Sequence, residues 1–144
     1  VSFLTHHLWQ PWQSASFFLA QNFLDFEPGI HYSQLQMQAG ETGVNTIRIY
    51  NPTKNAIEKD KEAGFIKKWL PKLKEVPIPL IYEPWKMSEI EQGLFNCKIG
   101  KDYPRPIVDI SETRKFALEK LWSIRKIKKV KEEKKRILEK HINS

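Results

Sequence analysis

Nine prolines limit what this chain can fold into more than any other feature of its sequence. Proline is excluded from helix interiors, and the residue before a proline avoids helical backbone angles. Every proline lies at or before position 106, so helices in that part of the chain must be short and separated by loops. Residues 107–144 contain no proline, which permits one long helix there.

Apolar residues recur at helical spacing, and no alternating strand pairs are present. The fold class is therefore predicted as all-α with long ordered loops. The wide apolar stripe of residues 12–24 predicts a well-buried helix that Pro28-Gly29 closes. Gly40 and Gly43 indicate irregular backbone, and Val76-Pro77-Ile78-Pro79 indicates an extended connector. The expected helices are 2–9, 12–24, 32–39, 52–58, 63–70, 88–94 and 109–140.

Three capping signals support the helix starts. Asn51 stands before Pro52 as a turn and cap residue. Ser88 is followed three residues later by Glu91, the pattern of a capping box. Asp109 precedes the last helix, whose apolar residues form a single stripe. That stripe consists of Ala117, Leu121, Ile124, Ile127 and Val130.

The net charge of +7 is concentrated near the C-terminus. Residues 114–140 hold 12 Lys/Arg and 4 Asp/Glu, whereas the rest of the chain holds 12 and 13. A nucleic-acid-binding surface over the whole domain therefore does not follow from the basic pI. The basic helix permits two interpretations: an electrostatic arm for phosphate, or a solvated helix held by ion pairs. The expected pairs are Lys128–Glu132, Lys129–Glu133 and Lys135–Glu139.

Other features of the sequence bear on location. Cys97 is the only cysteine, so an internal disulfide is impossible and a cytoplasmic location is expected. No apolar run approaches the ~18 residues of a transmembrane helix, so no membrane association is expected. Adjacent His6 and His7 point ~100° apart on a helix, so no metal site is expected. The chain opens at Val1 without a leader pattern and looks like part of a longer polypeptide.

Residues 23–52 combine three acids, a histidine, three glutamines and three glycines with apolar residues. Taken alone, Asp25 and Glu27 could cap the following helix, and His31 could be a structural histidine with satisfied hydrogen bonds. A buried carboxylate needs donors or a cation, however, and a cofactor can supply them.

Six sequence blocks occur in a fixed order. They are Trp12, Leu24-Asp25, Arg48-Ile-Tyr-Asn-Pro52, Gly64-Phe-Ile-Lys-Lys-Trp-Leu-Pro71, Glu83-Pro-Trp85 and Tyr103-Pro-Arg-Pro-Ile-Val-Asp109. Together they resemble the DNA photolyase/cryptochrome family over residues 2 to about 121. The resemblance implies that residues 1–110 are the C-terminal part of the helical FAD-binding domain. Residues 111–144 would be a basic C-terminal helix packed on that part or extending from it.

The resemblance also implies FAD as cofactor and a chemistry for the intact protein. In this family, blue light excites reduced flavin, which passes an electron to a pyrimidine dimer flipped out of damaged DNA. Damaged DNA is therefore the implied partner, together with upstream flavin-binding and antenna domains of the same polypeptide. This chain alone would be inactive and would hold one wall of the flavin site. An exposed wall of that kind could also drive self-association.

Five residues match cofactor-binding positions of the family. Asp25 matches an acid that pairs with an arginine beside the flavin, and Glu27 matches a second acid that contacts the cofactor. Ile30 and Gln34 match positions that line the isoalloxazine. His31 matches the position next to flavin N5, where an imidazole could exchange a proton near neutral pH.

Further matches concern electron transfer and DNA. Trp12 matches the middle tryptophan of the family's electron-transfer chain. Leu35 replaces the flavin-proximal tryptophan, which puts photoreduction of the family type in doubt. Met37 replaces a tryptophan of the lesion pocket and is softer as a stacking partner. Arg48 matches a basic residue near the DNA-facing rim.

Three functions remain open at this point. The first is a light-driven DNA photolyase, which Arg48 and the basic C-terminal segment favour. The second is a cryptochrome-like blue-light receptor, which the replacements at Leu35 and Met37 favour. The third is a truncated photolyase-like chain without activity of its own, which the start at Val1 favours.

Overall fold

The computed structural model describes residues 1–42 and 45–142, with side chains described up to residue 140. Gly43, expected to mark irregular backbone, lies outside the described residues. The described chain is helical and contains no strand, only an isolated bridge between Ile99 and Tyr103. The all-α prediction is therefore confirmed. The chain divides into two compact units: unit 1 consists of Val1–Tyr50 and Val108–Ser144, and unit 2 of Asn51–Ile107.

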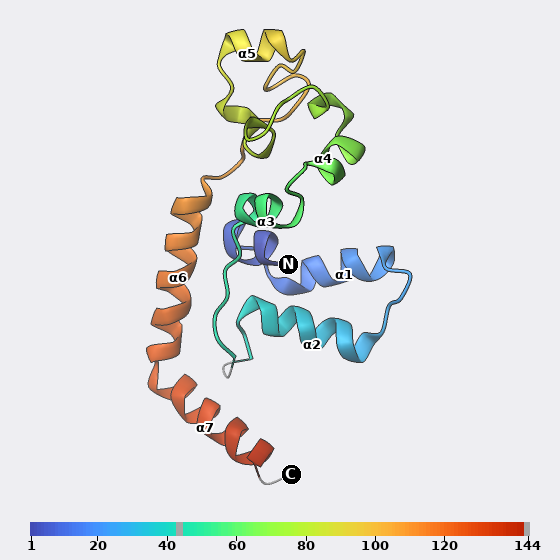
Figure 1. The fold of residues 1–144 in the computed structure, drawn as a ribbon. Coiled ribbons are helices and arrows are strands. Elements are labelled where there is room, and N and C mark those ends of the chain that lie inside the picture. Colours follow the sequence, from blue (N-terminus) through green and yellow to red (C-terminus); the bar gives the residue numbers. More distant parts are fainter. Residues whose placement is uncertain (43–44, 143–144) are drawn as a thin grey trace. The chain divides into compact units, whose positions relative to one another are not determined.

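Unit 1 contains a π-helix and four α-helices. Its elements are η1 (Phe3–His7), α1 (Trp12–Asn22), α2 (Pro28–Ala39), α6 (Ile110–Lys126) and α7 (Lys128–Ile142). Figure 1 shows α1 and α2 as an antiparallel pair joined by the 23–27 segment. Pro28 lies in the first turn of α2 rather than closing α1. That place suits proline because the first helical residues have no hydrogen bond to lose.

Helix α2 ends where Gly40 adopts a left-handed conformation with φ of 84°. The Gly40 N–H donates to the carbonyls of Gln36 and Met37, which closes the helix. A β-carbon at this position would be strained by its backbone angle, so glycine is the suitable residue. The irregular backbone expected at Gly40 is confirmed.

The expectation that residues 12–24 form a well-buried helix is wrong for α1. Only Ala15 and Ser16 are buried, whereas Phe17 and Phe18 are 61% and 64% exposed. Helix α1 packs on α2 and η1, and small residues fill these contacts. The neighbouring elements of this chain therefore bury only part of the wide apolar stripe.

The single long C-terminal helix that was expected is two helices. They are separated at Ile127, whose backbone is extended with φ of −61° and ψ of 132°. Neither proline nor glycine stands there, so the sequence gives no local signal for the break. The change of direction brings Val130 of α7 into the same pocket as Leu121 and Ile124 of α6. Tertiary packing thus prevails over local helix propensity.

Unit 2 has a hydrophobic core of its own. Its elements are α3 (Pro52–Lys59), α4 (Gly64–Trp69), η2 (Pro71–Leu73), η3 (Leu80–Tyr82), η4 (Pro84–Lys86) and α5 (Glu89–Leu94). The buried cluster consists of Ala63, Leu73, Val76, Ile81, Tyr82, Met87 and Cys97. The Tyr82 hydroxyl donates to the carbonyls of Asp60 and Lys61, both at 2.8 Å, which fixes the turn between α3 and α4.

The three predicted caps are confirmed. The Asn51 side chain accepts from the N–H of Lys54 at the start of α3. Ser88 and Glu91 form the complete capping box of α5. The Asp109 carboxylate accepts from the N–H groups of Ser111 and Glu112 at the start of α6.

Candidate functional site

Four of the predicted site residues lie on one face of α2. Glu27, Ile30, Gln34 and Met37 follow one another at spacings of three and four, which places them on the same side of the helix. We call this surface the α2 outer face. Glu27, Ile30 and Gln34 are exposed and Met37 is half-buried. Asp25 is exposed in the turn just before it, so the structure brings five predicted residues to one region.

His31 lies on the other side of α2, together with Leu35 and Ala39 at spacings of four. All three are buried, and the His31 ring is 6% exposed. Its Nε2 donates to the Ser16 carbonyl of α1 at 3.0 Å, which fixes the proton on that nitrogen. The rings of Phe23, Phe26 and Tyr32 stand roughly perpendicular to the His31 ring, with centroids 5.2–5.6 Å away. His31 therefore connects α2 to α1 and does not belong to the α2 outer face.

Trp12 and Arg48 lie apart from the α2 outer face. Trp12 begins α1, and its half-buried indole N–H donates to the Glu41 carboxylate at 2.9 Å. Glu41 follows the last turn of α2, so this contact closes the end of the α1–α2 pair opposite to the 23–27 connection (Figure 1). Arg48 is exposed in the extended segment that leads to Tyr50.

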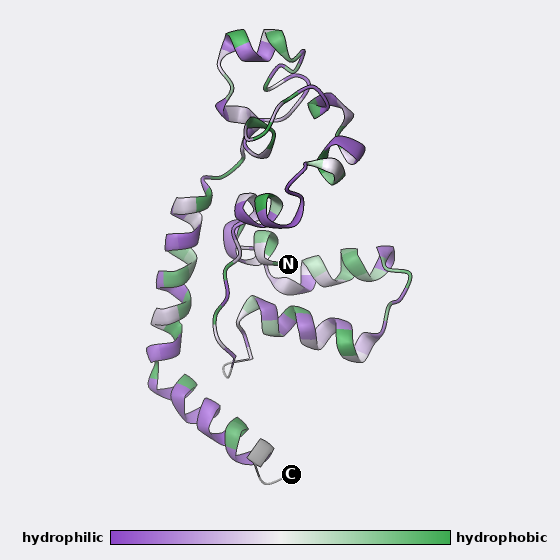
Figure 2. Ribbon diagram, viewed as in Figure 1, coloured by the Kyte–Doolittle hydropathy of each residue, from purple (hydrophilic) through white to green (hydrophobic). Residues whose placement is uncertain are grey.

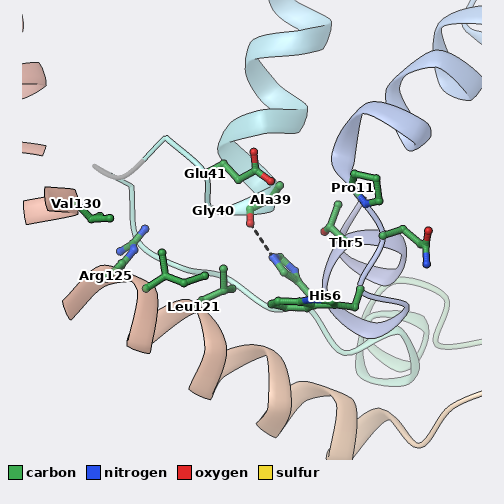
Figure 3. Close-up of a pocket in the computed structure, with 12 residues that line it drawn as sticks. Thr5, His6, Pro11, Ala39, Gly40, Glu41, Leu121, Arg125 and Val130 are labelled. Atoms are coloured by element: carbon green, nitrogen blue, oxygen red, sulfur yellow. Dashed lines mark hydrogen bonds between the residues drawn. The ribbon is translucent and has the colours of Figure 1, made fainter. Parts of the chain in front are cut away.

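A pocket of about 450 Å³ lies at this same end of unit 1. Figure 3 shows that Thr5 and His6 of η1 line one side, and Leu121 and Arg125 of α6 line another. The Arg125 guanidinium donates to the Asn45 carbonyl. Sequence analysis missed this pocket because its walls come from separate elements. The single signal it offered was the apolar stripe through Leu121 and Ile124.

A chain of hydrogen bonds runs through His6 at the edge of the pocket. The Tyr50 N–H donates to Ser2 Oγ at 3.0 Å, and Ser2 Oγ lies 3.0 Å from His6 Nδ1. His6 Nε2 donates to the Ala39 carbonyl at 3.2 Å. Burial lowers the pKa of His6 below its usual 6.5, and the neighbouring His7 lowers this pKa further, against the raising effect of the Ala39 hydrogen bond.

His7 makes a second buried bridge. Its Nε2 donates to the Tyr50 carbonyl at 2.9 Å, and its Nδ1 lies 2.8 Å from Thr113 Oγ1. One ring thus connects η1, the segment that ends at Tyr50, and the first turn of α6. Both histidines are 3% exposed or less and hold unit 1 together through polar contacts.

Metal-binding clusters and membrane-spanning helices are both absent from the described residues. Among residues 1–42 and 45–142, no group of three or more His, Cys, Asp or Glu side chains is placed to hold a metal ion. No helix in the same ranges is both long enough and apolar enough to cross a membrane.

The residues around the α2 outer face suit one part of a flavin dinucleotide. Asp25 and Glu27 are exposed acceptors, and a flavin ring and its ribityl chain offer N–H and O–H donors. Ile30 offers apolar surface to a ring. Arg48 is the only Lys or Arg among residues 1–50, so this segment offers little positive charge for a pyrophosphate. The fit is to the flavin side of the molecule rather than to its phosphates.

Comparison with known proteins identifies relatives of this chain. A family model described as the FAD binding domain of DNA photolyase matches residues 1–123. A deoxyribodipyrimidine photo-lyase of Alkalihalophilus pseudofirmus is 38% identical over 120 residues, which is 82% of this chain and 25% of that protein. A cryptochrome DASH of Gloeobacter violaceus is 30% identical over 78% of this chain and 23% of that protein.

A solved structure shows the same fold. The cryptochrome of Synechocystis sp. PCC6803 superimposes with a TM-score of 0.78 and 26% identity, over 82% of this chain and 25% of that one. The chain belongs to the photolyase/cryptochrome family and contains part of its helical FAD-binding domain, whose cofactor is FAD. It spans about a quarter of the length of the relatives that it matches.

Proposed function

We propose that this chain supplies the C-terminal part of a flavin-dependent, blue-light-driven DNA photolyase that repairs pyrimidine dimers. The observation that carries the proposal is the 38% identity over 120 residues to a protein named deoxyribodipyrimidine photo-lyase. In this proposal Asp25, Glu27, Ile30 and Gln34 hold the flavin side of FAD. Reduced FAD supplies the electron that splits the dimer.

The arrangement of residues around the α2 outer face supports the cofactor part of the proposal. Acceptors at Asp25 and Glu27 and an apolar side chain at Ile30 stand together and are exposed. Met37 continues the same face toward the end of α2, where we place the pocket for the flipped base. Arg48 we place at the DNA-facing rim.

His31 we propose as the residue nearest flavin N5. The hydrogen bond to the Ser16 carbonyl is the only one that its ring makes among the described residues, and it occupies Nε2. Nδ1 is then an acceptor, and because the ring is buried against α1, a flavin N–H would reach it only if α1 and α2 moved apart. The protonation of the photoreduced flavin should change in His31→Ala, and an unchanged flavin spectrum after illumination would reject this role.

Trp12 we propose as a member of the electron-transfer route. Leu35 is buried where the family has the flavin-proximal tryptophan, so an electron from Trp12 lacks the usual intermediate step. Photoreduction in Trp12→Phe should therefore be slower than in the parent protein. An equal rate would show that the route does not pass through Trp12.

A chimeric protein tests the function as a whole. Residues 1–123 would replace the matching segment of the Alkalihalophilus pseudofirmus photo-lyase, with Glu27→Gln in the same chimera as the site variant. Glu75→Gln changes an exposed acid in unit 2 and is the matched control. We expect the chimera and the control to retain FAD and to remove dimers from irradiated duplex in blue light but not in the dark. Glu27→Gln should weaken FAD retention.

The same chimera discriminates the two other functions. A chimera that retains FAD but repairs no dimers would support a cryptochrome-like blue-light receptor, consistent with the similarity to a cryptochrome DASH. A folded chimera that retains no FAD would support a photolyase-like chain without catalytic activity.

A further inference from the structure

Four lysines form a stripe along α7. Lys131 lies three residues after Lys128, and Lys134 and Lys135 lie three and four residues after Lys131; we call these four residues the lysine stripe. All four are exposed, with side-chain exposures of 91% for Lys128 and 80% for Lys135. Helical rise makes the stripe about 10 Å long. Figure 2 shows how strongly hydrophilic residues dominate this helix.

The acids of α7 neutralise only two of the four lysines of the stripe. Glu133 is held by Arg136, through two hydrogen bonds. Glu132 and Glu139 lie 3.9 and 3.8 Å from Lys128 and Lys135, as expected from the sequence. The expected pair of Lys129 with Glu133 is not among the ion pairs of the described chain.

Two lysines of the stripe remain without compensation. Within the part of the chain that the structure describes, Lys131 and Lys134 take part in no ion pair. Like charges three and four residues apart on a helix repel one another. The stripe therefore concentrates positive charge, which destabilises the helix. Binding of an external polyanion would reduce this repulsion.

We propose that the lysine stripe binds the phosphate backbone of duplex DNA without sequence preference. The choice of DNA rests on the proposed function and on the charge pattern of the stripe. Each strand of duplex DNA carries one negative charge per ~3.4 Å of axis, so the stripe can face about three phosphates of one strand. Lysine, a compact point charge on a flexible stem, suits contacts that hold DNA without reading its sequence.

The composition of α7 favours DNA over a lipid surface. A helix that lies in a membrane interface needs a broad apolar face with aromatic or leucine side chains. The apolar side chains described on α7 are Val130, Ile137 and Leu138, with no aromatic among them. Val130 lines the pocket of unit 1 and is not available to a membrane.

The test uses the 144-residue chain and an undamaged duplex of about 20 base pairs. Binding is followed by fluorescence anisotropy between 50 and 200 mM KCl, the range over which phosphate contacts weaken markedly. The stripe variant carries Lys131→Gln, Lys134→Gln and Lys135→Gln. The control carries Lys59→Gln, Lys61→Gln and Lys74→Gln, three exposed lysines of unit 2 with the same change of charge.

We expect the slope of log affinity against log salt to fall by about 2 to 3 in the stripe variant, because each phosphate contact contributes about 0.9. The control should keep the parent slope. A variant with arginine at the same three stripe positions should also keep it. Far-UV circular dichroism should show equal helix content in all variants, because glutamine and arginine favour helices about as well as lysine.

Three results would overturn the inference. The first is an equal slope in the stripe and control variants, and the second is no binding of duplex by the parent chain at 50 mM salt. The third is a stripe variant that loses binding to phosphatidylserine vesicles while its binding to duplex is unchanged. Failure of the proposed repair function is distinguishable. It would appear as absence of dimer loss in the chimera while the salt slope still depends on the stripe.

Discussion

Unit 2 and unit 1 are built on opposite principles. Unit 2 buries a continuous apolar cluster that includes Leu73, Val76 and Ile81, each 2% exposed or less. Unit 1 buries His6, His7 and His31 beside a few apolar residues such as Leu35 and Ala117, while Phe17 and Phe18 are exposed. We infer from the difference that unit 2 is stabilised mainly by its own apolar burial, whereas unit 1 depends more on buried hydrogen bonds. The apolar surface of α1 is left for contacts that this chain does not supply.

The largest effect is expected from a substitution in the core of unit 2. Leu73→Ala removes a side chain that is 1% exposed and should lower the free energy of unfolding of unit 2 by about 2–5 kcal/mol. Hydrogen exchange of the Asn51–Ile107 amides would measure it without assuming that both units unfold together. A decrease of less than about 0.5 kcal/mol in the free energy of unfolding would mean that the apolar cluster is not the source of the stability of unit 2.

A smaller effect is expected from the polar bridges of unit 1. His7→Ala removes the imidazole partner of the Tyr50 carbonyl and one partner of the Thr113 hydroxyl, which keeps the Asp109 carbonyl as an acceptor. The free energy of unfolding of unit 1 should fall by about 1–3 kcal/mol, as measured by hydrogen exchange of α6 amides. Gln10→Ala, at an exposed position beside η1, is the control and should change little. Equal effects of the two substitutions would contradict a role for the bridge.

Lowering the pH should decrease the stability of unit 1 through His6, a residue that unit 2 does not contain. Its pKa is lower in the folded chain than in the unfolded chain, so unfolding takes up a proton between the two values. The contribution of His6 is therefore complete above about pH 6.5 and decreases as the pH falls toward the folded pKa, with a slope of at most ~1.4 kcal/mol per pH unit.

Denaturant midpoints of unit 1 between pH 7 and 5 would measure this slope. His6→Gln keeps hydrogen-bonding capacity without the titration and should flatten it. Retention of the full slope in His6→Gln would assign the pH dependence to another group.

The smallest effect is expected on the exposed face of α1. Phe18→Ser changes a side chain that is 64% exposed and should alter the free energy of unfolding by no more than about 0.5 kcal/mol. Chemical denaturation of the chain would measure it. A loss near that of Leu73→Ala would mean that α1 is covered in solution, as self-association would do. Sedimentation at several concentrations would detect that case.

Much of the fold could be predicted because its signals are local. Prolines and capping residues such as Ser88 and Asp109 give helix starts that the structure confirms. The break at Ile127 could not be predicted, since it follows from the packing of Val130 on residues distant in sequence. The polar residues of 23–52 could be singled out by composition. His31 faces α1, whereas Ile30 and Gln34 face outward. These directions follow from the helix that starts at Pro28, and sequence analysis placed that start four residues too late.

The bridge made by His7 has a consequence for how the chain can be divided. Tyr50 is the last residue before unit 2, and Thr113 follows soon after the chain returns at Val108, yet one imidazole touches both. The His7 side chain therefore joins the segments that lie before and after the 57 residues of unit 2 (Asn51–Ile107). The Tyr50 carbonyl and the Thr113 hydroxyl both contact this one ring. We therefore expect that a short glycine-rich connector could replace unit 2 while the described helices of unit 1 keep their contacts.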